Sequence, residues 1–145
     1  MKEECMTINQ ISVFLENKSG RIAEVTRVLA EAGINLRAMT IADTADFGIL
    51  RIIANNYEKA REVLEANEFT TRVTRVLGIE VSDEPGGLYK IMKLFKDNGV
   101  NIEYLYATLE QKDGKSIVIF KVANVEQGLK IARDNALVTI SGDEF

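Results

Sequence analysis

The spacing of apolar residues changes along the first part of the chain. From Gln10 to Leu15 apolar residues recur with a period of two, which is typical of a strand. After Gly20 the apolar positions 22, 25, 29 and 32 follow a helical period, and charged residues occupy the opposite helix face. Gly33 is predicted to end this helix, because glycine enters the left-handed backbone region without a Cβ penalty.

Two strands, a second helix and a further strand complete the first half. Residues 35–41 and 47–54 predict a hairpin, because Asp43-Thr44-Ala45-Asp46 between them is typical of a turn. Asn56 is a candidate N-cap for a helix with apolar positions 57, 60, 63 and 64. The β-branched residues of 70–76 predict a fourth strand. The first half therefore reads as βαββαβ.

The same order of elements is predicted for the second half. It comprises a strand at 77–81, a helix at 88–95 that ends at Asn98-Gly99, strands at 102–109 and 116–122 around the Asp-Gly pair of 111–115, a helix capped by Asn124, and a short strand at 138–140. No linker separates Val76 from Leu77.

A loop motif marks the start of the first helix in each half, and the two copies lie 66 residues apart. The copies read Asn17-Lys18-Ser19-Gly20-Arg21-Ile22 and Asp83-Glu84-Pro85-Gly86-Gly87-Leu88. Thirteen residues after the glycines at 20 and 86 come Gly33-Ile34-Asn35-Leu36 and Gly99-Val100-Asn101-Ile102. Self-similarity at a fixed offset indicates tandem repeats. We therefore predict an α+β fold of two ferredoxin-like βαββαβ domains, residues 8–75 and 76–145, each with an antiparallel sheet covered by helices on one face.

The charge and composition of the chain exclude some classes of binding partner. The net charge of −4 divides into −1 for residues 1–75 and −3 for residues 76–145, so neither half offers the basic surface that nucleic acid requires. The opening residues lack the apolar core of a signal peptide, and no apolar run approaches the roughly 18 residues that would span a bilayer. We expect a cytoplasmic protein that binds neither nucleic acid nor membrane. Cys5 is the single cysteine, and we expect a surface thiol without function.

The chain lacks the residues of a typical catalytic or metal site. It contains no histidine, which is the commonest general base and a common metal ligand. The acidic pairs Asp43 with Asp46 and Glu103 with Glu110 lie on predicted turns or exposed strand edges, where solvation is the simpler interpretation. We therefore predict no enzyme activity, no metal and no cofactor. Tyr104 and Tyr106 share one strand face, where packing is favoured over base stacking because no basic residues are interleaved with them.

The repeated loop can be interpreted in two ways. The first N–H groups of a helix are unpaired and carry partial positive charge, so a carboxylate would fit beside them. Asn17 or Asp83 could then accept a hydrogen bond from an ammonium group, and the loop would grip both ends of an amino acid. Alternatively, these two side chains form the N-cap or Asx-turn that often precedes a helix. The residues alone leave both interpretations open.

The second copy resembles the ACT domain signature, an Asp-x-Pro-Gly-x-Leu loop, a helix and then Gly-x-Asn-Ile. The first copy is similar, although Ser19 replaces the proline and Arg21 stands where the second copy has Gly87. The resemblance covers about residues 10–141 and is to small stand-alone proteins of two tandem ACT domains. Residues 16–20 and 101–103 also resemble the small regulatory subunit of acetolactate synthase.

This resemblance implies a non-catalytic regulatory protein that binds a free amino acid where ACT domains meet. The ligand is then expected between the loop before the first helix of one domain and the neighbouring domain, near the start of its second strand. The implied ligand-binding residues are Asn17, Lys18, Ser19, Gly20, Arg21, Ile22, Asn35, Leu36, Asp83, Glu84, Pro85, Gly86, Gly87, Leu88, Asn101 and Ile102.

The alternative is a regulatory or interaction subunit of an amino-acid biosynthetic enzyme, without a ligand of its own. For either function we expect a homodimer, because each sheet must find cover for residues such as Tyr104 and Tyr106. Apolar residues near the candidate sites, among them Ile22, Met39 and Leu88, favour a ligand with an apolar side chain.

Overall fold

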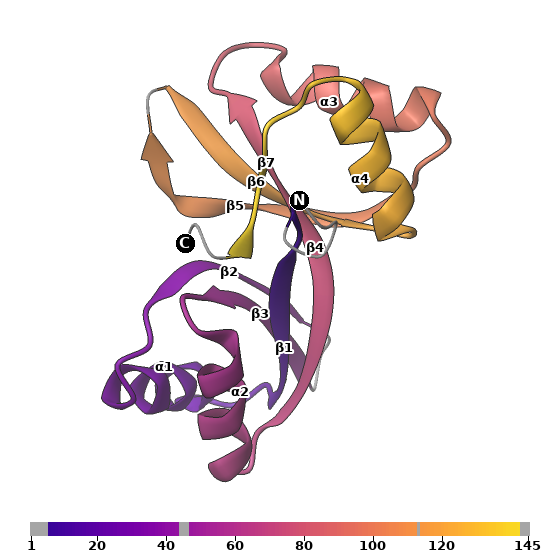
Figure 1. Ribbon diagram of the computed structural model, residues 1–145. Coiled ribbons are helices and arrows are strands. Elements are labelled where there is room, and N and C mark those ends of the chain that lie inside the picture. The colour runs from indigo at the N-terminus through magenta and orange to yellow at the C-terminus, as the bar shows by residue number, and fades with distance from the viewer. Residues whose placement is uncertain (1–5, 44–46, 113, 143–145) are drawn as a thin grey trace. The chain divides into compact units, whose positions relative to one another are not determined.

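The computed structural model describes residues 6–43, 47–112 and 114–142. Cys5, three residues of the predicted turn at Asp43–Asp46, and position 113 of the second predicted turn lie outside this range. The described residues form, in order, β1 (Ile8–Glu16), α1 (Arg21–Glu31), β2 (Leu36–Asp43), β3 (Phe47–Ala54), α2 (Tyr57–Ala66), β4 (Thr70–Ser82), α3 (Gly87–Asp97), β5 (Ile102–Lys112), β6 (Lys115–Val122), α4 (Val125–Asp134) and β7 (Thr139–Ile140), as Figure 1 shows. The prediction of an α+β fold with antiparallel strand pairs is confirmed.

The largest correction concerns the junction between the repeats. The sequence predicted one strand at 70–76 and another at 77–81, whereas β4 is a single strand from Thr70 to Ser82. The described chain therefore contains seven strands instead of the eight predicted. No proline, asparagine or aspartate interrupts 70–82, and Gly78 is accommodated inside the strand, so nothing in the backbone requires the strand to end at Val76. One strand thus completes the first repeat and begins the second.

Contacts divide the chain into two compact units. The first unit, residues 9–74, contains strands in the order β4, β1, β3, β2. The second unit, residues 75–142 with 6–8, contains strands in the order β7, β4, β6, β5. Counted from the start of each repeat, both orders run fourth, first, third, second, as a βαββαβ repeat requires. The β1–β3 and β2–β3 pairs are antiparallel, and so are β4–β6, β4–β7 and β5–β6.

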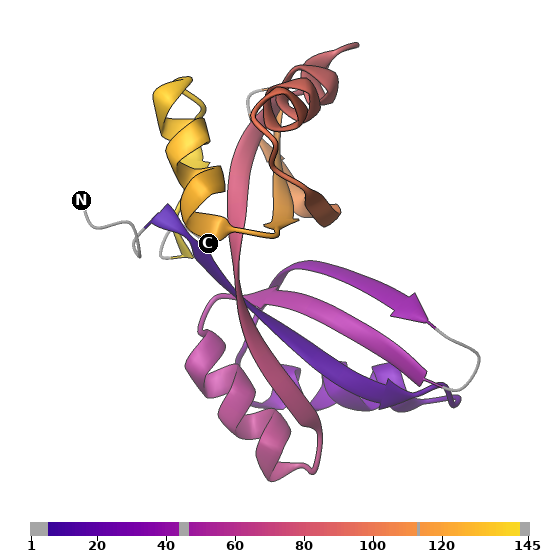
Figure 2. The same ribbon diagram turned by 90° about the vertical axis from the view of Figure 1, so that its right-hand side faces the viewer.

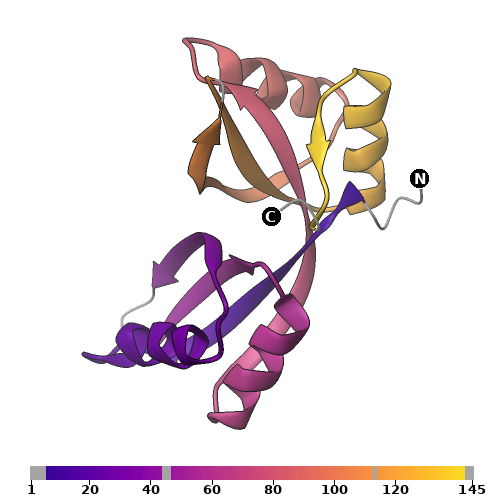
Figure 3. The same cartoon turned by 60° about the vertical axis from the view of Figure 1, so that its left-hand side comes forward.

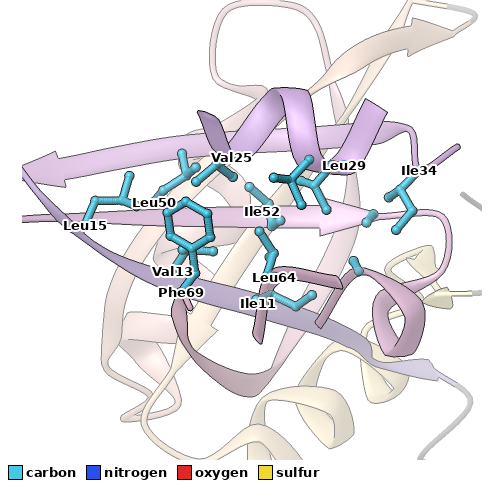
Figure 4. Packing of buried hydrophobic residues seen from close by; sticks show 13 residues of the cluster. Ile11, Val13, Leu15, Val25, Leu29, Ile34, Leu50, Ile52, Leu64 and Phe69 are labelled. Atoms are coloured by element: carbon cyan, nitrogen blue, oxygen red, sulfur yellow. The ribbon is translucent and has the colours of Figure 1, made fainter. Parts of the chain in front are cut away.

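The core of the first unit lies between its helices and one face of its strands. Alternate residues of β1 and β3 point toward this core, and α1 and α2 lie on that same face (Figure 2). Figure 4 shows how closely these side chains pack. The buried cluster consists of Ile11, Val13, Leu15, Val25, Val28, Leu29, Ile34, Leu50, Ile52, Ala54, Ala60, Leu64 and Phe69. Its members recur at every second strand position and at helical spacing, which is the pattern that the sequence predicted.

The second unit repeats this arrangement with its own core, and α3 and α4 lie against its strands (Figure 3). Phe95 of α3 and Phe120 of β6 meet edge to face, with ring centroids 5.8 Å apart. The segment before β1 also contributes, because Met6 packs against this core and Ile8 is almost fully buried. The N-terminal described residues therefore stabilise the second unit, although β1 continues into the first unit.

No helix in residues 6–43, 47–112 or 114–142 is long and apolar enough to cross a membrane.

Candidate functional site

Both repeated loops form the same tight turn. The amide N of Arg21 donates to the carbonyl O of Lys18 at 3.3 Å, and that of Gly87 donates to the carbonyl O of Glu84 at 3.0 Å. Gly20 has φ 87° and ψ −8°, and Gly86 has φ 85° and ψ −5°. These angles are those of the third residue of a type II turn, where a side chain is disfavoured. The turn explains both glycines without reference to a ligand.

The turn also explains a departure from the family signature. Pro85 occupies the second turn position, where its fixed φ suits a type II turn. Ser19 occupies that position in the first loop, and the backbone of Gly20 keeps the same conformation. The missing proline therefore leaves the shape of the first loop unchanged.

The helices that follow these loops begin without a side-chain cap. The N-caps of α1 and α3 are Gly20 and Gly86, and neither helix has a side-chain cap among the described residues. The N-cap interpretation of Asn17 and Asp83 is therefore wrong, because the turn places a glycine between each of them and its helix, whereas the Asx-turn interpretation stays a prediction.

The other two helices begin differently. Asn56 Oδ1 accepts a hydrogen bond from the amide of Lys59 at 3.2 Å, and Asn124 Oδ1 accepts one from the amide of Gln127 at 3.1 Å. The sequence predicted both of these caps. The chain thus caps α2 and α4 with a side chain, whereas α1 and α3, which carry the motif, have a glycine N-cap and no side-chain cap.

The two loops differ in charge. The first contains Lys18 and Arg21, and the second contains Asp83 and Glu84. Lys18 Nζ lies 2.7 Å from Glu16 Oε2, and this hydrogen bond holds the pKa of the Glu16 carboxyl below its ordinary value. The first loop therefore contains more positive charge than the second, although its Lys18 is already paired with Glu16.

Arg21 lies in the first unit with its guanidinium over an aromatic ring. Its Cζ is 4.7 Å from the centroid of Phe69. The Arg21 Nε is buried and has no hydrogen-bond partner among the described residues. This cation–π contact fixes the side chain against the end of the first core.

The second loop lies closer to its strand than a side chain at its last glycine would allow. A Cβ at Gly87 would be 2.1 Å from the backbone carbonyl O of Ser82. Arg21 occupies the equivalent position in the first loop. The two loops therefore share a turn but pack differently against their strands.

The residues at the start of the second strand of each repeat are held by backbone pairing. The carbonyl O of Asn35 accepts from the amide of Asn55 at 3.2 Å, and the carbonyl O of Asn101 accepts from the amide of Ala123 at 3.1 Å. Both asparagine side chains are exposed. The strand register shifts just after these residues in both repeats, at 36–38 and at 102–104. Such an irregularity re-aims side chains at a strand end.

An open depression of about 410 Å³ lies at this point in the second unit. Its lining includes Asn101 and Ile102, which the sequence predicted, and Met92 and Lys96, which it missed. Met92 and Lys96 are four residues apart on α3, so they share the helix face that leads to Gly99. That spacing was the signal that could have identified them.

The structure does not bring the two halves of each predicted site together within one unit. The loop lies at the start of α1 or α3, and the Gly-x-Asn segment lies beyond the end of the same helix. Each helix has 11 residues. It is therefore about 16 Å long, which exceeds the length of one amino acid. Each unit thus carries two separate groups of candidate residues, which we call half-sites.

Exposed apolar side chains accompany the loops. Ile22 is 45% exposed and Leu88 is 38% exposed, and each is the second residue of its helix. An apolar ligand side chain could pack on either of them.

The described residues offer no metal site, since no group of three or more His, Cys, Asp or Glu side chains gathers in residues 6–43, 47–112 and 114–142. Each of the acidic pairs considered above has a member whose side chain lies outside that range. Glu103 is bound by Lys121 at 2.7 Å, and the side chains of Asp46 and Glu110 lie outside the described residues.

Comparisons with known proteins agree on one family. The model of the family described as "ACT domain pair" matches residues 6–145. The acetolactate synthase small subunit of Buchnera aphidicola subsp. Baizongia pistaciae (strain Bp) is 27% identical over 95 residues, which are 65% of this chain. This chain spans only 59% of the length of that curated relative.

Two solved structures resemble this chain along most of its length. Protein BT0572 from Bacteroides thetaiotaomicron is 37% identical with a TM-score of 0.92, and the match covers 98% of this chain and 97% of that one. The regulatory subunit of aspartate kinase from Thermus thermophilus, in its ligand-free form, is 18% identical with a TM-score of 0.62, and the match covers 87% and 90%. The second likeness shows a shared fold. Because the family model matches nearly the whole chain, and its two signature loops form the same turn, this chain belongs to the ACT domain pair family.

Proposed function

We propose that this protein is a non-catalytic regulator that binds a free amino acid through its repeated loops. Membership of the ACT domain pair family supports a regulatory role, and so does the similarity to a protein named as the small subunit of acetolactate synthase. The candidate residues carry no catalytic constellation, so binding is the activity that their chemistry supports.

The contrast between the helix N-termini carries the proposal. The side chains of Asn56 and Asn124 accept from the amide of the third residue of α2 and α4, whereas the N-caps of α1 and α3 are glycines. The first amide of each of these helices, at Arg21 and Gly87, already donates within the turn, so a ligand carboxylate would accept hydrogen bonds from the next amides of α1 or α3 and gain from the positive end of the helix dipole. Gly20 and Gly86 leave open space where a Cβ would otherwise stand.

The half-sites at the second strands would supply the remaining contacts. In the second unit, the Lys96 ammonium and the exposed Asn101 amide border the 410 Å³ depression, which has room for an amino-acid side chain. Within a unit, one helix length separates the loop half-site from the strand half-site. A ligand that contacts both kinds of half-site must therefore contact two domains. The expected position where ACT domains meet stays a prediction.

The test begins with a thermal-shift screen of the protein against the twenty amino acids. A ligand present at 100 times its dissociation constant raises the free energy of unfolding by about 2.7 kcal/mol, which is easily detected. Titration calorimetry on any amino acid that raises the Tm would then give its affinity and the number of sites.

Two variants locate the site in the repeats. Asn101→Ala and Asn35→Ala each remove an exposed side chain whose backbone pairing is retained, so the fold should persist. At least one of them should weaken binding about tenfold. Asn67→Ala is the control, because Asn67 is an exposed asparagine outside the motif, at the end of α2, where its side chain donates to the carbonyl O of Val63. Full binding by both motif variants would remove the strand half-site from the proposal.

The second candidate function is a subunit that acts through contact with an amino-acid biosynthetic enzyme, without a ligand of its own. The name of the curated relative favours it. It predicts that no amino acid changes the Tm of the wild-type protein. It also predicts that the protein binds the catalytic subunit of acetolactate synthase from the same organism.

A further inference from the structure

The depression in the second unit combines an apolar wall with one positive charge. It lies where the last turn of α3 meets the start of β5. Met92 and Ile102 supply apolar surface, and both are partly buried against the second core. Lys96 is the one charged residue in the lining, which contains no acidic residue. A ligand group that enters the depression therefore meets apolar surface beside an ammonium.

Lys96 has no ion pair among the described residues. Acidic residues lie nearby in the sequence, but other lysines bind them. Lys93 Nζ lies 2.6 Å from Asp97 Oδ2, and Lys121 Nζ lies 2.7 Å from Glu103 Oε2. The hydrogen bond from Lys93 is the largest cause of the lowered pKa of the Asp97 carboxyl, and the charge of Lys96 is a smaller one. The Lys96 ammonium is thus available to an anionic group from outside the described chain.

The first repeat shows that the fold does not require this lysine. The 66-residue offset between the repeats places Ala30 of α1 at the position of Lys96 in α3. Both helices have 11 residues and end at the same kind of turn, in which the amide of Gly33 donates to the carbonyl O of Ala30 and the amide of Gly99 donates to that of Lys96. A lysine in the last turn gains from the helix dipole. Because α1 ends in the same way without a basic residue there, the helix end alone does not explain Lys96.

We propose that the second unit selects an amino acid with a carboxylate side chain, aspartate or glutamate, and that Lys96 is the specificity-determining residue. This inference rests on the proposed function, since it names the class of ligand that the strand half-site would take. The side-chain carboxylate of the ligand would accept a charge-assisted hydrogen bond from Lys96 Nζ. Its methylene groups would pack on Met92 and Ile102. The α-carboxylate, which all amino acids share, would be left for the loop half-site.

The inference departs from the apolar ligand expected from the sequence. That expectation rested on residues such as Ile22, Met39 and Leu88, none of which lines the depression. An apolar side chain placed against Lys96 would remove water from the ammonium without replacing its hydrogen bonds, which is unfavourable. A basic side chain would be repelled. An acidic side chain is therefore the best match to this lining.

The test compares each acidic amino acid with its neutral amide, aspartate with asparagine and glutamate with glutamine. Titration calorimetry on the full chain measures the four affinities. Because an acid and its amide have nearly the same shape, the difference in affinity reports the charge of the side chain. At least one acid should bind about tenfold more tightly than its amide. Since Lys96 is exposed, about 1 M salt should reduce this preference.

The first repeat supplies the test variant. Lys96→Ala places the residue of α1 at the equivalent position of α3, so the variant should fold. It should weaken binding of the preferred acid about tenfold and leave binding of the amide within about twofold. Lys96→Arg keeps the charge and should retain the preference for the acid. Lys90→Ala is the matched control, because Lys90 is an exposed lysine of the same helix that does not line the depression. It should leave both affinities unchanged.

The possible outcomes separate this inference from the proposed function. If no amino acid raises the Tm, the proposed function is wrong and the inference fails with it. If amino acids bind but neither acid is preferred to its amide, or if Lys96→Ala retains the preference, the inference alone is overturned. An equal loss of acid and amide binding in Lys96→Ala would show that Lys96 holds a group common to all amino acids. That result would also overturn the inference and would leave amino-acid binding intact.

Discussion

Ile8 occupies the space into which a side chain at Gly78 would project. A Cβ at position 78 would lie 2.6 Å from Ile8 Cδ1, closer than real carbon atoms approach. Ile8 is 1% exposed, and the carbonyl O of the preceding Thr7 accepts from the amide of Gly142 at 3.3 Å. The N-terminal segment is therefore seated on β4, and the glycine in β4 makes room for it.

Gly78→Ala should destabilise the protein by about 1–3 kcal/mol, because Ile8 must move within a packed environment. Ile8→Val removes the clashing Cδ1 and alone should cost about 0.5–1.5 kcal/mol. The double variant should be more stable than the sum of the two effects predicts. Urea unfolding of all four proteins measures this coupling, and strict additivity would show that the two residues do not compete for space.

The adjacent glycines of the second loop should respond differently to alanine. Gly86→Ala meets open space but a positive φ, which should cost about 1–2 kcal/mol. Gly87→Ala places its Cβ 2.1 Å from a backbone oxygen, which cannot move as a side chain can. It should cost more than the roughly 3 kcal/mol at which overpacking usually ends. Equal losses of unfolding free energy would refute this reading of the loop.

The capping asparagines should affect stability alone. Asn56→Ala and Asn124→Ala each remove a hydrogen bond to a helix amide and should cost about 1 kcal/mol. Neither residue belongs to a half-site, so ligand affinity should stay within twofold of the wild type. Chemical denaturation and calorimetry on the same samples check the two statements. Replacement by Asp, which can also cap, should restore most of the stability.

The stability of the protein should fall at acid pH and should stay nearly constant near neutral pH. Hydrogen bonds from Lys or Arg side chains are the largest cause of a lowered pKa in the carboxyls of Glu16, Glu24, Glu65, Asp97, Glu126 and Asp134. A carboxyl with a lowered folded-state pKa stabilises the fold above its unfolded-state pKa, and that contribution is lost as pH falls through the folded-state pKa.

The Tm should therefore decline below about pH 4.5, the ordinary pKa of a glutamate in these pairs. Because these carboxyls are exposed, about 1 M salt should shrink the decline. Between about pH 5.5 and 7 the Tm should be nearly constant, since the chain has no histidine. Melting temperatures measured across this pH range in low and high salt test both effects. A steep change of the Tm near pH 6.5 would contradict the conclusion that these carboxyls cause the pH dependence.

Local pattern was sufficient to predict the four helices and the strands other than β4. The periods read from positions 10–15 and 22–32 already placed Ile11, Val13, Leu15, Val25 and Leu29 in the first core, whereas Ile22 of the same helical period is 45% exposed. The paired glycines at 20 and 86 were also decisive, because a backbone with positive φ selects glycine whatever surrounds it. The repeat, the family and the Asn caps at 56 and 124 could all be predicted from residues that lie close together in the sequence.

Tertiary structure decided what depends on residues distant in sequence. That residues 70–82 form one strand follows from pairing with partners on both sides, which no local period records. Ile8 packs on Gly78 across 70 positions. The separation of each loop from its Gly-x-Asn segment follows from the straight helix between them. Propensity and pattern determine the short-range backbone conformation, so it can be predicted from the sequence. Contacts between distant residues depend on how the whole chain packs, which no local pattern records.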